Sequence, residues 1–126
     1  MNNAEFASLV GELKTPLPTQ KTLVDELRAK IAFAESSGII LSQYVRTLSQ
    51  VLDEETAKAL TELKEDDVYI KSNADEKKLL LYSRTSELRA RLEYMEKLEE
   101  LVKRRCSLGQ SLLKSVDLET RASFNS

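Results

Sequence analysis

The side chains with the greatest chemical potential in this 126-residue chain are one cysteine, two acidic clusters and a short basic run. Cys106 directly follows Arg104 and Arg105, and neighbouring cations stabilise a reactive thiolate. The chain has no histidine, so it lacks the commonest general base and metal ligand. Cys106 also falls on a hydrophobic helical repeat. Because free cysteines are mostly buried, we interpret it as a core residue.

The acidic clusters, at residues 53–55 and 65–67, could offer oxygen ligands to a divalent cation. Their spacing differs from the D-x-D-x-D-G pattern of a calcium loop, and they spread over more than one helical turn. We interpret them as a solvated acidic surface. We therefore expect no metal site and no cofactor.

Two short patterns resemble minimal kinase sites, namely Thr15-Pro16 and Arg104-Arg105-Cys106-Ser107. Phosphate on Ser107 would add about two negative charges beside a packed helix face. Patterns this short occur often by chance, so neither assigns a function.

Enzymatic chemistry has little support in the remaining residues. There is no Gly-rich phosphate loop. Paired carboxylates do acid–base chemistry only in a concave, dry site that shifts their pKa values, and long exposed helices do not form one. We expect a protein that is not an enzyme.

Composition favours long helices as the elements that position these residues. Charged residues make up 32% of the chain and aromatic residues 6%, with three Gly, two Pro and no Trp. A sheet protein needs more turn residues and aromatics. We expect one all-α unit, with two arms of nearly equal length at 19–65 and 73–116. At about 1.5 Å of rise per residue, each arm would be on the order of 65–70 Å long.

Charge is distributed unevenly along the arms. Residues 51–76 hold three basic and nine acidic side chains, whereas residues 77–116 hold ten basic and five acidic ones. In an antiparallel hairpin the acidic end of the first arm would lie beside Lys77, Lys78 and Arg84. A nucleic-acid-binding domain has a broad basic face and an overall basic charge, but this chain has a net charge of −2. We expect no nucleic-acid binding.

Residues 1–18 predict a short amphipathic helix followed by a linker. Phe6, Leu9, Val10 and Leu13 recur at helical spacing, and Pro16 and Pro18 then interrupt the helix. So short a helix is not stable alone in water. It must dock either on the hairpin or on a partner, and the sequence leaves both possibilities open.

The first arm carries apolar residues, one Gly included, at alternating steps of three and four, with Thr19 or Thr22 as its predicted N-terminal cap. These are Val24, Leu27, Ile31, Ala34, Gly38, Leu41, Val45, Leu48 and Leu52. At Gly38 we favour close helix contact over a break. Ile40, Tyr44 and Val51 form a second stripe, which predicts a third helix packed there. In an alternative reading a separate helix begins after Asp53, giving a three-helix bundle.

The second arm begins at Asn73, with Glu76 three residues later as an N-terminal signature. Its repeat comprises Leu81, Leu88, Leu92, Met95, Leu98, Val102, Cys106, Gly109, Leu113 and Val116. From Tyr94 a second stripe continues through Leu101, Leu108 and Leu112, wider than a two-helix hairpin would cover. Residues 117–126 lose the periodicity and predict a flexible tail.

The predicted fold is therefore a long antiparallel, coiled-coil-like helical hairpin with a short N-terminal helix. The sequence leaves open whether the hairpin closes to a three-helix bundle. Tyr69, between apolar neighbours Val68 and Ile70 in the acidic connection 65–72, predicts either a docking contact or a residue tucked under the hairpin tip. The candidate partner-binding residues are Ile40, Tyr44, Val51, Tyr69, Leu98, Leu101, Val102, Leu108 and Leu112.

Function is predicted only as a class. The first hypothesis is a scaffold or adaptor subunit that binds partner helices by coiled-coil packing, in a hetero-complex or a homo-oligomer. The alternative is an autonomous binding module or chaperone, whose N-terminal helix covers a groove until a client helix displaces it.

The membrane is not an expected partner. The longest apolar run is Leu79-Leu80-Leu81-Tyr82, whereas a membrane span needs about 20 such residues. The basic residues of the second arm also do not oppose a face rich in Trp or Phe. With no export signal and a single cysteine, we expect a cytoplasmic or nuclear location.

Overall fold

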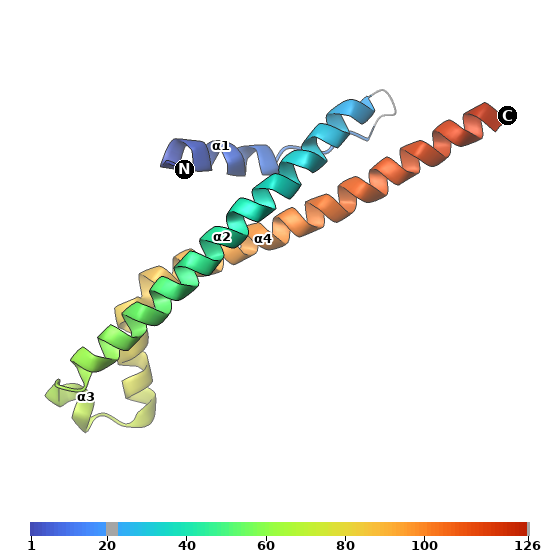
Figure 1. The fold of residues 1–126 in the computed structure, drawn as a ribbon. Coiled ribbons are helices and arrows are strands. Elements are labelled where there is room, and N and C mark those ends of the chain that lie inside the picture. Colours follow the sequence, from blue (N-terminus) through green and yellow to red (C-terminus); the bar gives the residue numbers. More distant parts are fainter. Residues whose placement is uncertain (20–22, 126) are drawn as a thin grey trace. The chain divides into compact units, whose positions relative to one another are not determined.

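The computed structural model describes residues 1–19 and 23–125, with side chains in the last helix described up to residue 118. The described residues form four α-helices: α1 (Asn3–Leu13), α2 (Val24–Leu63), α3 (Asp67–Lys71) and α4 (Ala74–Asn125). The described residues form no strand. The predicted all-α helical hairpin with a short N-terminal helix is confirmed. Figure 1 labels the four helices along the chain.

The helices fall into two units. Unit 1 is built from residues 1–42 and from residue 97 onward, and unit 2 from residues 43–96. Within unit 1 the two long helices are antiparallel, because Ile31 meets Gly109 whereas Gly38, further along α2, meets Val102, earlier on α4. The predicted antiparallel pairing therefore holds in this unit.

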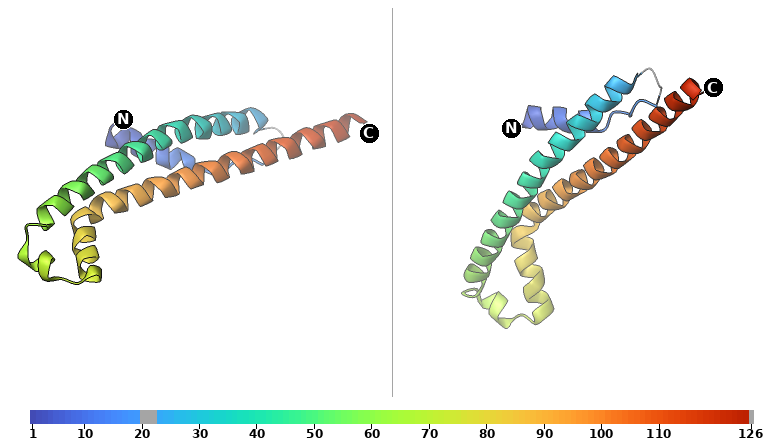
Figure 2. Two further views of the ribbon diagram at one scale, coloured as in Figure 1. Left: turned by 60° about the horizontal axis from the view of Figure 1, so that its bottom comes forward. Right: turned by 45° about the vertical axis from the view of Figure 1, so that its right-hand side comes forward.

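The core of unit 1 lies between α1, the first part of α2 and the last part of α4. Its buried side chains are Leu9, Val10, Leu13, Leu27, Ile31, Ala34, Ser37, Leu41, Leu98, Val102 and Val116. α1 buries its three residues here, so it docks within its own chain (Figures 1 and 2). Of the two possibilities that the sequence left open for α1, the structure shows docking on the hairpin.

Two glycines set how closely the helices of unit 1 approach each other. A Cβ added at Gly109 would lie 2.6 Å from Cγ1 of Ile31, and one added at Gly38 would lie 3.0 Å from Cγ1 of Val102. Real Cβ atoms do not tolerate the first distance. The predicted close contact at Gly38 is therefore present, and α2 continues through it without interruption.

Unit 2 has a smaller buried core. Its buried residues are Leu52, Ala59, Leu63 and Thr85, whereas most of its heptad residues are only half-buried. Arg84 forms an ion pair with Glu62, with 3.4 Å between nitrogen and oxygen. The acidic end of the first arm was predicted to lie beside Arg84. Both side chains are about half exposed, so the pair contributes little stability.

In unit 2, α4 bends where its colour passes from yellow to orange (Figure 2). Three hydroxyl side chains in this stretch bond back to the carbonyl oxygen three or four residues earlier: Ser83 to Leu80, Thr85 to Leu81 and Ser86 to Ser83. Such bonds compete with the backbone ladder and bend helices. The buried Thr85 hydroxyl also accepts a 2.9 Å bond from Nε of Arg89.

The observed helix boundaries test the predicted helix break and the predicted N-terminal caps. α2 is continuous from Val24 to Leu63, so the alternative break at Asp53 is wrong. Thr19 lies too early to cap α2, and Thr22 lies outside the described residues. At the other arm, Asn73 accepts a 2.9 Å bond from the Glu76 amide and donates from its amide to the Glu76 carboxylate at 3.0 Å, as predicted.

Two segments differ from the sequence-based expectation. The predicted connection 65–72 contains the short helix α3, whose N-cap Asp66 accepts bonds from the amides of Val68 and Tyr69. α4 continues to Asn125, past the end predicted at residue 116. A helix can continue without apolar periodicity when its residues have good helical propensity, and Leu118, Glu119, Arg121 and Ala122 do.

Candidate partner-binding surface

The most exposed part of the predicted apolar stripe lies on α4 of unit 1. We call Leu101, Leu108 and Leu112 of α4, together with Leu17 of the linker, the leucine face. Leu108 is 55% exposed, and the other three are half-buried. A shallow groove of about 280 Å³ lies here, lined by Thr15, Pro16, Leu17, Leu101, Arg104, Arg105 and Leu108. The stripe is therefore only partly covered by the chain itself.

Arg105 fixes the linker at one edge of this groove. Its guanidinium donates to the carbonyl oxygen of Thr15 at 2.5 Å, to that of Glu12 at 3.4 Å and to Oγ1 of Thr15 at 3.1 Å. These acceptors stand at the end of α1, where carbonyl groups have no partner within the helix. Hydrogen bonds from a charged donor contribute about 1.5–3 kcal/mol each when well formed. Arg105 therefore anchors both the end of α1 and the linker.

Lys30 adds a second cation to the same anchor from α2. Its Nζ lies 2.9 Å from Oγ1 of Thr15 and 3.2 Å from a carboxylate oxygen of Glu12. The Thr15 hydroxyl itself donates to the carbonyl oxygen of Glu12 at 2.7 Å. Within this cluster, Nε of Arg105 is buried without a hydrogen-bond partner.

α1 covers a different side of unit 1. A groove of about 510 Å³ separates it from α2, with Met1, Ala4, Glu5, Ser8, Leu9, Phe33, Ser36, Ser37 and Ile40 as its lining. The predicted third helix is thus α1 at Ile40, whereas Tyr44 and Val51, the other members of that predicted stripe, do not line this groove. Since α1 packs on this side, it leaves Leu108 uncovered.

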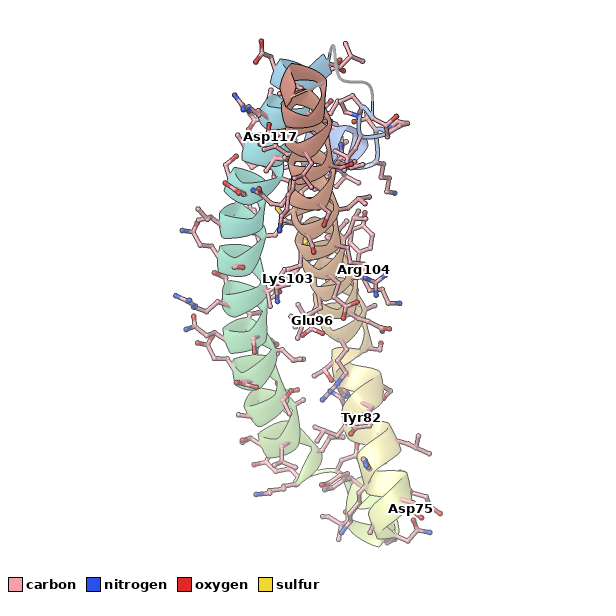
Figure 3. All side chains as sticks on the ribbon, turned by 90° about the vertical axis from the view of Figure 1, so that its right-hand side faces the viewer. Asp75, Tyr82, Glu96, Lys103, Arg104 and Asp117 are labelled. Carbon is pink, nitrogen blue, oxygen red and sulfur yellow. The ribbon has the colours of Figure 1, made fainter. Side chains whose placement is uncertain are left out.

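Arg104 and Arg105 form a basic rim along the groove of the leucine face, and Arg104 is its exposed member. The Arg104 side chain is 81% exposed, and its ion pair with Glu100, one turn earlier, spans 3.8 Å. Figure 3 shows Arg104 on the side of α4 that is turned away from α2. A weak surface pair of this kind leaves the guanidinium free to change partners.

The predicted partner-binding residues occupy three kinds of environment. Leu98 and Val102 are both 4% exposed and fill the core of unit 1. Ile40 lines the groove under α1, and Leu101, Leu108 and Leu112 lie on the leucine face. In unit 2, Tyr44, Val51 and Tyr69 are half-buried. Binding of a partner by any of them stays a prediction.

Tyr69 has a neighbour in unit 2 that explains its partial burial. Nζ of Lys77 lies 5.3 Å from the centroid of its ring, within range of a cation–π interaction. Val68 and Ile70, on either side of Tyr69, are 68% and 55% exposed. α3 therefore presents its aliphatic side chains to solvent while its aromatic ring contacts α4.

Cys106 is half-buried, in unit 1. Burial raises the pKa of its thiol above the ordinary 9.0; Glu35 raises it further, and the Arg105 cation opposes them. The thiol is therefore less ready to ionise than a free cysteine, in contrast to an activated nucleophile. The interpretation of Cys106 as a packing residue fits this environment.

Within residues 1–19 and 23–125, no three His, Cys, Asp or Glu side chains are grouped closely enough to hold a metal ion. The same part of the chain has no helix with both the length and the apolar character to cross a membrane.

Sequence reasoning missed the anchor formed by Thr15, Lys30 and Arg105. Thr15 and Arg105 were each noticed, but as parts of separate kinase-like patterns. Their contact joins residues that are 90 positions apart. No local spacing in the sequence indicates such a contact. The general signal is that the last carbonyl groups of a helix accept bonds from cationic side chains.

Comparison with protein-family models, with curated proteins and with solved structures finds no match to this chain.

Proposed function

We propose that this protein is a non-catalytic scaffold or adaptor that binds a partner helix on the leucine face of unit 1. The observation that carries the proposal is the position of Leu108, a 55% exposed leucine on a heptad stripe, beside a groove that α1 does not cover. Leu101 and Leu108 are seven residues apart, which is the repeat that an opposing helix can follow.

The charge around the groove specifies the partner further. Arg104 and Arg105 of α4 both line the groove, and Arg104 is largely exposed. A helix with apolar residues at heptad spacing and acidic residues beside them would complement this face, since opposite potentials favour association and register. We infer an acidic amphipathic helix of another protein as the partner.

The small size of the groove limits the binding free energy that it can contribute alone. Burying the exposed half of one leucine contributes on the order of 1 kcal/mol. A stable protein interface buries roughly 800 Å² on each side. The partner helix must therefore follow α4 beyond this groove, and the leucine face would set its register.

A photo-crosslinking amino acid at position 108 tests the proposal in cells. We expect one discrete adduct, mapped by mass spectrometry to an acidic helical segment of another protein. Gln110 provides the matched control, because it is exposed on the same helix but points to another face. Equal adducts from positions 108 and 110, or none from position 108, would contradict the proposal, and adducts with a second copy would replace the hetero-complex with a homo-oligomer.

The alternative function, a binding module with a displaceable cover, is favoured by one observation. α1 docks in its own chain and buries Leu9, Val10 and Leu13, as a removable cover would. In that case the isolated protein would be a monomer with a sharp thermal transition, and client binding would release α1. Light scattering combined with circular dichroism separates the two: self-association or weak folding favours the scaffold subunit.

A further inference from the structure

The surroundings of Thr15 suggest a role for the Thr15-Pro16 sequence, which the proposed function does not involve. Thr15 precedes Pro16, and the chain's other proline, Pro18, follows Leu17. Thr15-Pro16 is therefore the single Ser/Thr-Pro sequence in the chain. The residues at 16–19 have no helical structure, so no helix has to unfold there for a kinase to bind this segment in an extended form.

We propose that Thr15 is a phosphorylation site for a proline-directed protein kinase, and that Arg105 and Lys30 hold the phosphate. Both cations already donate to Oγ1 of Thr15, at 3.1 Å and 2.9 Å. A phosphothreonine carries about −1.5 to −2 charge near neutral pH and offers three acceptor oxygens. The cluster thus has donors at the position where these oxygens would be attached.

The transfer step uses a nucleoside triphosphate supplied with the kinase. Oγ1 of Thr15 attacks the γ-phosphorus of ATP, and the bond from that phosphorus to the β–γ bridging oxygen breaks. ADP leaves, and a base of the kinase takes the hydroxyl proton. The hydroxyl must first release its 2.7 Å bond to the carbonyl oxygen of Glu12. It must also release the bonds that it accepts from Lys30 and Arg105, because the attack needs a free lone pair on Oγ1.

Two sources of negative charge near Thr15 would repel a phosphate group, and the cations must outweigh them. The Glu12 carboxylate lies next to Lys30, and the C-terminal end of α1 carries partial negative charge, equivalent to about half an elementary charge. Against them stand the full charges of Lys30 and Arg105, with Arg104 lining the same groove. The unpartnered Nε of Arg105 is a further donor in the cluster. The cations therefore outweigh the opposing charge.

The consequence for partner binding rests on the proposed function. A dianion on Thr15 would lie beside Leu101 and Leu108, which line the same groove. It would neutralise the basic rim and disfavour an acidic partner helix. Phosphorylation would then weaken binding at the leucine face while leaving α1 docked.

The test uses the 126-residue chain, ATP and a proline-directed serine/threonine kinase, with the peptide 12–19 as reference. We expect phosphate on Thr15 by mass spectrometry, and none on the Thr15→Ala variant. In the phosphorylated chain, ³¹P NMR should give a second phosphate pKa about one unit below that of the phosphopeptide, because two cations favour the dianion. Arg105→Gln should return that pKa toward the peptide value.

A matched control removes one cation elsewhere on α4: Arg91→Gln, whose side chain is 65% exposed and pairs with Glu87, should leave the phosphate pKa unchanged. Circular dichroism checks that Arg105→Gln remains folded, and Lys30→Gln provides a second variant. The site is wrong if the peptide is phosphorylated and the folded chain is not, or if the kinase modifies neither. A phosphate pKa equal to that of the peptide would overturn the pairing. These readouts need no partner, so they can fail or succeed independently of the leucine face.

Discussion

Unit 1 and unit 2 use the same two long helices but bury very different amounts of apolar surface. In unit 1, α1 supplies a third helical surface, and residues such as Leu27, Ala34 and Leu41 are at most 2% exposed. In unit 2 most heptad residues stay half-buried, and an ion pair and a cation–π contact connect its helices. A heptad repeat thus predicts pairing, whereas full burial requires a third element.

The contrast also concerns how closely the helices approach. Gly38 and Gly109 allow tight contact in unit 1, whereas residues 43–96 contain no glycine. Tight packing gains dispersion contacts that a looser pair forfeits. We therefore expect unit 1 to carry most of the stability of the chain.

The largest expected effect is a charge placed in the core of unit 1. Val102→Asp should lower the free energy of unfolding by on the order of 4 kcal/mol, because residue 102 is 4% exposed and a carboxylate there would be buried among apolar side chains. Lys103→Ala, at an exposed neighbouring position, should change it by less than about 0.5 kcal/mol. Urea unfolding followed by circular dichroism measures both. A Val102→Asp variant as stable as the wild type would refute the assigned core.

A series of glycine substitutions tests the close contacts. Gly109→Ala should destabilise by about 1–2 kcal/mol, since overpacking against Ile31 costs about 1–3 kcal/mol and the gain in helical propensity is about 1 kcal/mol. Gly38→Ala, with its 3.0 Å contact, should be near neutral. Gly11→Ala in α1 meets nothing within 4 Å and should stabilise by up to about 1 kcal/mol.

Chemical denaturation gives the order of these three variants directly. If Gly109→Ala and Gly11→Ala both stabilised to the same extent, the helices of unit 1 would not be in close contact at Ile31.

The anchor of α1 gives an effect of intermediate size. Arg105→Gln should destabilise by about 1–2 kcal/mol, because it removes a charged donor from three acceptors at the end of α1. Arg104→Gln removes the same charge from an 81% exposed side chain and should be nearly silent. Thermal unfolding of the two variants compares them. Equal losses would mean that net charge, and not the anchor, stabilises unit 1.

The smallest effect concerns Cys106. Burial raises its thiol pKa, so the neutral form is favoured in the folded chain. The resulting stability is present below the ordinary cysteine pKa of 9.0 and is lost as the pH rises through the higher folded value. At pH 8, alkylation by iodoacetamide should be slower in the folded chain than in urea. Faster alkylation in the folded chain would indicate an activated thiolate.

The hydrophobic periodicity of the sequence correctly predicted many of the buried residues of the two long helices. The residues Leu27, Ile31, Ala34, Leu41, Leu98 and Val102 were all assigned to heptad repeats, and all are buried. The Asn73 cap was predictable because capping is a local interaction. The continuity of α2 through Asp53 was harder to predict, since an acidic residue can either cap a helix or lie on its solvated face.

The candidate surface was only partly predictable. The stripe Leu101, Leu108 and Leu112 was visible as spacing, but which part of it stays uncovered depends on where α1 docks. The docked end of α1 accepts bonds from Arg105 and Lys30, which reach it from α4 and α2. Such contacts follow from tertiary structure and leave no periodic signal.

The most direct test of the difference between the units is amide hydrogen exchange of the isolated chain, resolved to short peptides. We expect the amides of α1, and of residues 27–41 and 98–112, to exchange more slowly than those of residues 45–60 and 78–95, because exchange follows local opening. α1 is too short to be helical alone, so its protection can come only from docking. Exchange of α1 at the rate of an unfolded peptide, or equal protection of the two units, would contradict this account.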